Sequence, residues 1–121
     1  MSKLLIYQYP QCGTCRNAVK WLRANGHELE IRHIVEAPPT VSELNDLINT
    51  SGLELKKFFN VSGEVYKSMG LKDKLGEMSR EEQIELLSSN GKLIKRPIVS
   101  SGEQVTVGFK EDQYANVWGS E

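Results

Sequence analysis

The chain has 121 residues, of which 39% are hydrophobic and 26% charged, and this length fits one compact domain that buries a core without a metal ion or a disulfide. Its 15 basic and 16 acidic side chains leave a formal net charge of -1, which gives no support for direct nucleic-acid binding, because such proteins concentrate basic residues on one face. The sequence shows no signal-peptide core and no bilayer-spanning apolar run, so we expect a cytoplasmic monomer without membrane contact.

The first part of the chain predicts a β-α-β unit. Residues 4–7 are an apolar, β-prone run that stops near Pro10, as is typical of a buried strand. Residues 13–25 carry apolar side chains at helical spacing, and Gly26 follows where a left-handed residue commonly ends a helix. Apolar and charged residues then alternate over 28–35, which indicates a strand with two unlike faces.

Residues 36–95 indicate an all-helical insert. Residues 40–43 and 79–82 both have the spacing of a capping box, which predicts the start of a helix at each place. Val41 opens the apolar stripe expected on the first of these helices. The apolar residues of 55–59 indicate a short helix between the two.

The last part of the chain predicts a hairpin and a final helix. Residues 97–99 and 105–107 are β-prone and are joined by a turn at Ser101-Gly102. Residues 110–118 are expected to form the last helix. The predicted order is therefore β-α-β, a helical insert, and β-β-α, which is an α/β fold.

Cys12 and Cys15 stand at the predicted junction of the first strand and the first helix. The first turn of a helix has unpartnered N–H groups and a partial positive charge, which favour a thiolate and lower its pKa. Cys12, at the mouth of the helix, is expected to be the attacking thiol, and Cys15, one turn further, the resolving thiol. The two intervening residues allow a strained, reducible disulfide. Arg16 adds a cation in the first turn.

Two other interpretations of the cysteines remain open. With His27 and His33, the pair approaches the spacing of a zinc finger, although a finger places both histidines on a helix and His33 falls in a predicted strand. Alternatively, both cysteines are inert hydrophobic residues of the core. We expect no metal site, because a domain of this size folds without one.

Arg96 and Pro97 form a second notable feature. The proline either marks the start of a strand or follows a cis peptide bond. In the second case Arg96 is a fixed cation that can hold an anion. The sequence alone does not place Arg96 near Cys12.

The segment Tyr9–Arg16, the helical insert and Lys95–Val99 together resemble the ArsC/Spx family over essentially the whole chain, and most of all its YusI-like members. The resemblance implies a thioredoxin-like fold in a single domain. Its core is expected at about 1–35 and 96–121, and the all-helical insertion at about 36–95.

The resemblance also implies roles for the site residues. Cys12 is the redox nucleophile, Pro97 is a cis-proline, and Arg96 approaches the active-site sulfur. We expect an anionic substrate group to bind Arg96 and the helix start at Gly13, Thr14 and Arg16. Arsenate reductases of the family carry three arginines around the oxyanion, whereas only Arg96 matches here.

By the same resemblance, Asn60 and residues 108–111 stand at the positions of the other two arginines. Two guanidinium contacts that would bind a dianion are therefore missing. Spx regulators keep the cysteine pair and a stretch similar to residues 107–112, and they bind the C-terminal domain of the RNA polymerase α subunit. This chain is expected to lack the basic C-terminal extension that is typical of those regulators.

We therefore expect a thiol–disulfide oxidoreductase in which Cys12 and Cys15 form a redox-active disulfide. It needs no bound cofactor and takes electrons from an external thiol donor: thioredoxin, glutaredoxin or a low-molecular-weight thiol. One alternative is an Spx-type redox-sensing regulator that binds RNA polymerase. The other is an arsenate reductase linked to glutaredoxin or thioredoxin.

Overall fold

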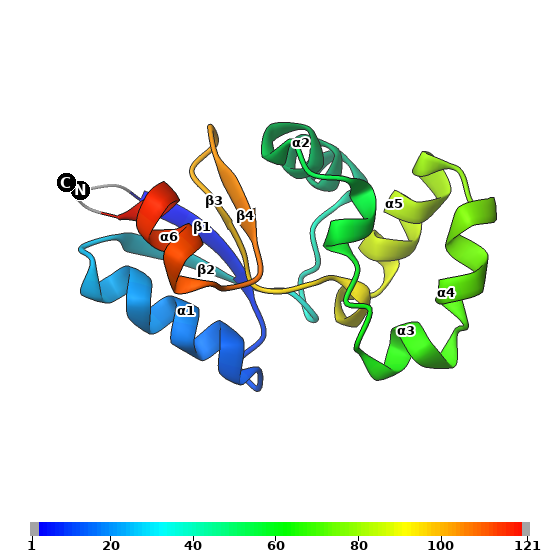
Figure 1. Ribbon diagram of the computed structural model, residues 1–121, viewed down its shortest axis with the longest axis horizontal. Helices are drawn as coiled ribbons and strands as arrows, with labels where there is room; N and C mark the ends of the chain where they lie inside the picture. The colour runs from blue at the N-terminus through cyan, green and yellow to red at the C-terminus, as the bar shows by residue number, and fades with distance from the viewer. Residues whose placement is uncertain (1–2, 120–121) are drawn as a thin grey trace.

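The computed structural model describes residues 3–119 and contains a four-stranded mixed sheet with helices on both faces (Figure 1). The strands lie in the order β2-β1-β3-β4 and comprise β1 (Lys3–Gln8), β2 (Glu28–His33), β3 (Ile98–Ser100) and β4 (Val105–Val107). β2 is parallel to β1, whereas β3 is antiparallel to both β1 and β4. The predicted α/β, thioredoxin-like fold is confirmed.

The helices follow the predicted order. α1 (Gly13–Ala24) joins β1 to β2, and α6 (Glu111–Trp118) follows β4. The insert contains α2 (Val41–Ser51), α3 (Glu64–Ser68), α4 (Leu71–Lys74) and α5 (Arg80–Ser89), with the 3₁₀ turns η1 (Leu55–Phe58), η2 (Leu75–Glu77) and η3 (Gly91–Leu93). Within residues 3–119, no helix is long and apolar enough to cross a membrane.

Local chemistry explains where the principal insert helices begin. Thr40 and Glu43 form a complete capping box at the start of α2, and Ser79 and Glu82 form another at the start of α5, as predicted. Gly52 then ends α2 in the left-handed conformation.

Three details of the insert and its borders differ from the prediction. Val41 is 39% exposed and does not belong to the buried stripe of α2, which consists of Leu44, Leu47 and Ile48. The helix predicted over 55–59 is the 3₁₀ turn η1, and the chain leaves the sheet after His33, earlier than the alternation over 28–35 indicated.

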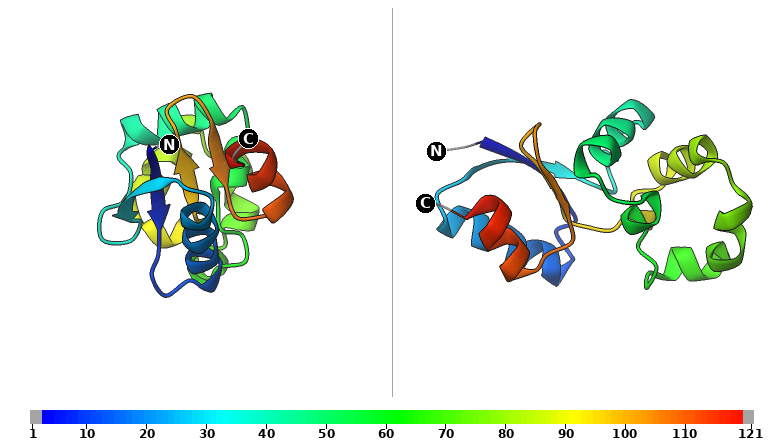
Figure 2. Two further views of the ribbon diagram at one scale, coloured as in Figure 1. Left: turned by 90° about the vertical axis from the view of Figure 1, so that its left-hand side faces the viewer. Right: turned by 45° about the horizontal axis from the view of Figure 1, so that its top comes forward.

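Two separate sets of helices bury the two faces of the sheet (Figures 1 and 2). On one face α1 and α6 pack on β1 and β3, in a cluster of Leu4, Ile6, Ala18, Leu22, Val99, Tyr114 and Trp118. On the other face the insert covers Tyr7 and Ile98, in a cluster that includes Leu44, Phe58, Ile84 and Leu93. Because successive residues of a strand point to opposite faces, β1 contributes to both cores and anchors the site at its end.

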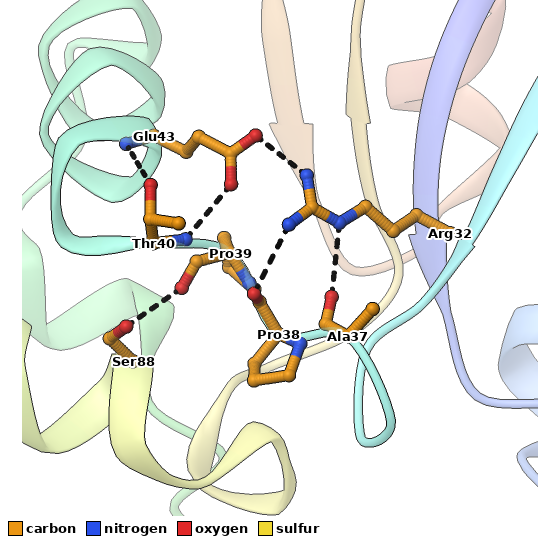
Figure 3. Close-up of polar contacts among 7 residues, drawn as sticks. All are labelled: Arg32, Ala37, Pro38, Pro39, Thr40, Glu43 and Ser88. Atoms are coloured by element: carbon orange, nitrogen blue, oxygen red, sulfur yellow. Dashed lines mark hydrogen bonds and ion pairs between the residues drawn. The ribbon is translucent and has the colours of Figure 1, made fainter.

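Arg32 connects the edge strand β2 to the start of the insert (Figure 3). Its guanidinium donates to the carbonyls of Ala37 and Pro38 over 3.0 and 3.3 Å and to Glu43 Oε2 over 2.6 Å. It also lies 5.2 Å from the centre of the Tyr7 ring. One side chain thus holds the turn after β2, the cap of α2 and the sheet together.

Replacing Arg32 with alanine should lower the free energy of unfolding by about 2 kcal/mol near neutral pH, because a charged group with three acceptors is lost. Urea denaturation measures the change. The control is Lys3→Ala, which removes an ion pair to Glu30 between side chains that are each 65% exposed and should change stability by less than ~0.5 kcal/mol.

The same comparison has an expected pH dependence. The hydrogen bond from Arg32 holds the pKa of Glu43 below its usual range, so this contribution is present above the ordinary carboxyl pKa and is lost as the pH falls. The difference between wild type and Arg32→Ala should therefore shrink below about pH 4. A difference that stays constant down to acid unfolding would contradict the assignment.

Candidate active site

Cys12 occupies the N-cap position of α1, and its sulfur replaces the usual capping oxygen. The N–H of Cys15 donates to Cys12 Sγ over 3.4 Å. The N–H of Cys12 donates to the carbonyl of Tyr9 over 2.9 Å, which closes the loop between β1 and α1. Cys12 is half-buried, Cys15 is fully buried, and both are free thiols.

The surroundings separate the pKa values of the two thiols. Partial burial opposes ionisation of Cys12, but the N–H and thiol of Cys15 and the charge of Arg96 outweigh it and lower the pKa of Cys12. Burial raises the pKa of Cys15 to about 12, against the hydrogen bond that the Tyr9 N–H donates to its sulfur over 3.5 Å. These surroundings therefore favour the thiolate at Cys12 over the thiolate at Cys15.

Arg96 comes from the distant segment that returns from the insert to β3. The Arg96–Pro97 peptide bond is cis. The guanidinium lies 5.1 Å from the centre of the Tyr9 ring, and its Nη1 donates to the carbonyls of Lys92 and Ile94 over 3.3 and 3.5 Å. Arg96 and Cys12 line the same cavity, so the structure supplies the proximity that the sequence pattern alone did not provide.

The cavity at Cys12 measures about 350 Å³. Three cationic side chains line it, from Lys95, Arg96 and Lys110, and within residues 3–119 no acidic side chain does. Hydroxyl and amide groups from Thr14, Asn60 and Ser62 add hydrogen-bonding capacity, and Val107 and Phe109 supply apolar surface. This arrangement can hold an anionic group beside a thiolate.

The predicted anion-binding residues do not all meet at this cavity. Thr14 and Arg96 line the cavity. Gly13, the first residue of α1, is not one of its lining residues. Arg16 instead donates to the carbonyl of Pro10 over 2.8 Å and lines a different groove, beside Lys20.

Lys95 and Lys110 were not among the predicted site residues. Lys95 directly precedes the Arg96-Pro97 pair, and this adjacency is the signal in the sequence that could have identified it. Lys110 lies between β4 and α6, within the stretch 108–111 that the family resemblance placed at an arginine position around the oxyanion, whereas no local pattern reveals that this loop bends toward Cys12.

The structure does not assemble the zinc-site alternative. Within residues 3–119, no three potential metal ligands from His, Cys, Asp or Glu form a group that could hold a metal ion. His27 contacts the carbonyl of Trp118, and His33 Nδ1 accepts from the backbone N–H groups of Val35 and Glu36. The half-buried position of Cys12 at a cavity likewise differs from an inert core residue.

Comparisons with known proteins place the chain in a family. The ArsC family model matches residues 7–117. YusI of Bacillus subtilis (strain 168) is 56% identical over 115 residues, which cover 95% of this chain and 98% of YusI. An arsenate reductase of Yersinia enterocolitica is 36% identical over 99 residues, which cover 82% of this chain and 69% of that enzyme.

The fold comparison agrees with the sequence comparison. The crystal structure of an ArsC family related protein from Bacteroides fragilis matches with a TM-score of 0.90 and 51% identity, over 94% of this chain and 96% of the other. Sequence and structure thus lead to the same assignment: the chain belongs to the ArsC family.

Proposed function

We propose that the protein is a cytoplasmic thiol–disulfide oxidoreductase that acts as a monomer. The observation that carries the proposal is the division of roles between the two sulfurs. Cys12 is accessible from a cavity and favours the thiolate, whereas Cys15 is buried one turn away and keeps its proton. Its similarity to an arsenate reductase supports thiol-based redox chemistry in general terms.

The reaction follows from this division. The Cys12 thiolate attacks one sulfur of a substrate disulfide, forms a mixed disulfide and releases the other sulfur as a thiolate, which takes up a proton. Cys15 then loses its proton and attacks Cys12 Sγ, so the Cys12–Cys15 disulfide forms and the second substrate thiol leaves. Two electrons have passed to the substrate, and an external thiol donor returns them by the reverse exchange. Thioredoxin, glutaredoxin or a small thiol is suited to this step.

The cavity favours a substrate with an anionic group near the reacting sulfur. Lys95, Arg96 and Lys110 supply positive charge, and Arg96 carries the one guanidinium among the described residues that line the cavity. A carboxylate needs one such bidentate partner, whereas arsenate reductases of the family use three arginines on the oxyanion. We therefore rank reduction of carboxylate-bearing disulfides above reduction of arsenate.

A redox-sensing regulator that binds RNA polymerase would use the same cysteine pair as a switch. It would capture the C-terminal domain of the polymerase α subunit in one redox state and would not turn over a disulfide. A pull-down with that domain, done with reduced and oxidised protein beside a turnover assay, distinguishes the two functions.

Alkylation by iodoacetamide should distinguish the two thiols by their pKa values. The rate at Cys12 should reach half its maximum below the ordinary thiol value of about 8.5, because its thiolate forms at lower pH. Cys15 should stay unmodified until far higher pH, since its pKa is raised to about 12. Mass spectrometry of the labelled peptides follows both residues. Faster modification of Cys15, or an ordinary pH profile at Cys12, would overturn the assigned roles.

Replacing Cys15 with serine should trap the intermediate. The variant retains the attacking sulfur but has no resolving thiol, so a mixed disulfide with the substrate should accumulate on Cys12. Mass spectrometry after mixing with a small disulfide such as cystine would detect it. Cys12→Ser is the matched control and should trap nothing. Equal trapping by both variants, or by neither, would contradict the mechanism.

Arg96→Ala should slow reduction of an anionic disulfide about tenfold more than reduction of a neutral one, since it removes a charge-assisted contact. Dithiodiglycolate and hydroxyethyl disulfide are a suitable pair. Arg96→Lys keeps the charge without the planar fork and should recover part of the loss. Equal slowing of both disulfides would show that Arg96 does not recognise the anion.

A further inference from the structure

Tyr9 contacts each of the three groups on which the chemistry rests. We propose that Tyr9 is a positioning residue: its backbone holds the amide of Cys12 and the sulfur of Cys15, and its ring holds the guanidinium of Arg96 beside Cys12. This inference rests on the proposed function only in taking Cys12 as the reactive thiol.

The backbone of Tyr9 holds both cysteines. Its carbonyl accepts from the N–H of Cys12 over 2.9 Å, and its own N–H donates to Cys15 Sγ over 3.5 Å. Tyr9 directly follows β1, whose residues contribute to the cores on both faces of the sheet. The two contacts therefore tie the backbone of Cys12 and the sulfur of Cys15 to the end of β1.

The ring of Tyr9 restrains Arg96, which has little else to hold it. The guanidinium lies 5.1 Å from the ring centre, within the range of a cation–π contact. Its Nη1 makes two long hydrogen bonds to the carbonyls of Lys92 and Ile94, and its buried Nε has no hydrogen-bond partner among the described residues. The ring is itself held edge-to-face by the imidazole of His33, with 5.6 Å between the ring centres.

A neighbouring hollow lies on the Tyr9 side of Arg96. The hollow measures about 240 Å³, shares Arg96 and Asn60 with the Cys12 cavity, and is also lined by Tyr9, Lys92 and Glu64. Arg96 thus borders two spaces, with the Tyr9 ring at the hollow and Cys12 at the cavity. The contact with the ring limits how far the guanidinium can move between them. The phenol hydroxyl points to a different partner, Oε1 of Gln11, over 2.9 Å.

The test measures the pKa of Cys12 from the pH profile of iodoacetamide alkylation in the full-length reduced protein. Tyr9→Leu should raise this pKa and lower the alkylation rate near pH 6.5 by roughly two- to fivefold, because the leucine side chain has no π face. Tyr9→Phe should retain the wild-type profile, because it keeps the aromatic ring. Gln11→Ala, which removes only the partner of the hydroxyl, should leave the profile unchanged.

A second pair of variants, in which Arg96 is replaced by glutamine, tests whether Tyr9 affects Cys12 through Arg96. In Arg96→Gln protein, adding Tyr9→Leu should leave the pH profile of Cys12 alkylation unchanged, because the cation is already absent. The other charged groups nearby are the same in both backgrounds: Lys95 and Lys110 in the cavity, Lys92 and Glu64 in the hollow, and His33 beside the ring. A shift that persists without Arg96 would overturn the proposal.

If Tyr9→Leu does not fold, fluorinated phenylalanines at position 9 keep the ring shape while weakening its π face. The Cys12 pKa should then rise stepwise with fluorine content, and a constant pKa would overturn the proposal. Disulfide reduction by the wild type is measured separately. If the wild type reduces disulfides but Tyr9→Leu leaves the Cys12 pKa unchanged, only the role of Tyr9 is rejected. If Tyr9→Leu shifts the pKa but the wild type does not reduce disulfides, only the oxidoreductase function is rejected.

Discussion

A single hydrogen bond, from the Cys15 N–H to Cys12 Sγ, joins the start of α1 to the chemistry of the site. A helix start needs an acceptor for its unpartnered N–H groups, and most helices obtain a hydroxyl or a carboxylate oxygen there. Here the acceptor is sulfur, which accepts better as a thiolate than as a thiol. Formation of the helix and ionisation of Cys12 therefore stabilise each other, so the reactive state is also the state in which the helix is best capped.

The other wall of the site depends on how the insert is closed. Asn60 lies inside the insert, after η1, and Lys95 lies at the end of the insert. Two backbone hydrogen bonds of 2.8 Å join these segments, from the Asn60 N–H to the carbonyl of Leu93 and from the Lys95 N–H to the carbonyl of Phe58. They tie the segment that carries Arg96 to the middle of the insert, which helps to fix this cation beside the sheet.

Much of the fold could be predicted because its signals are local. Both capping boxes, the glycine that ends α2, and the alternation of the strands depend on residues a few positions apart. The short helices α3 and α4 had no such signal, since each is shorter than two turns and its buried residues, Tyr66 and Leu71, show no periodicity. The cysteine pair was recognisable for the same reason of local spacing. Its proximity to Lys110 could not be derived from local spacing, because the path of the whole chain brings them together, and only the family resemblance of residues 108–111 suggested it.

The order of the site residues along the chain also bears on biosynthesis. The ribosome releases Cys12 and Cys15 with β1 and α1, long before Arg96 and the two strands that complete the sheet. Until then β1 has only β2 beside it, and the thiol lacks the guanidinium that helps to lower its pKa. In the nascent chain the start of α1 can already stabilise the thiolate, but the charge of Arg96 is missing. Completion of the sheet therefore adds the last of the groups that lower the pKa of Cys12.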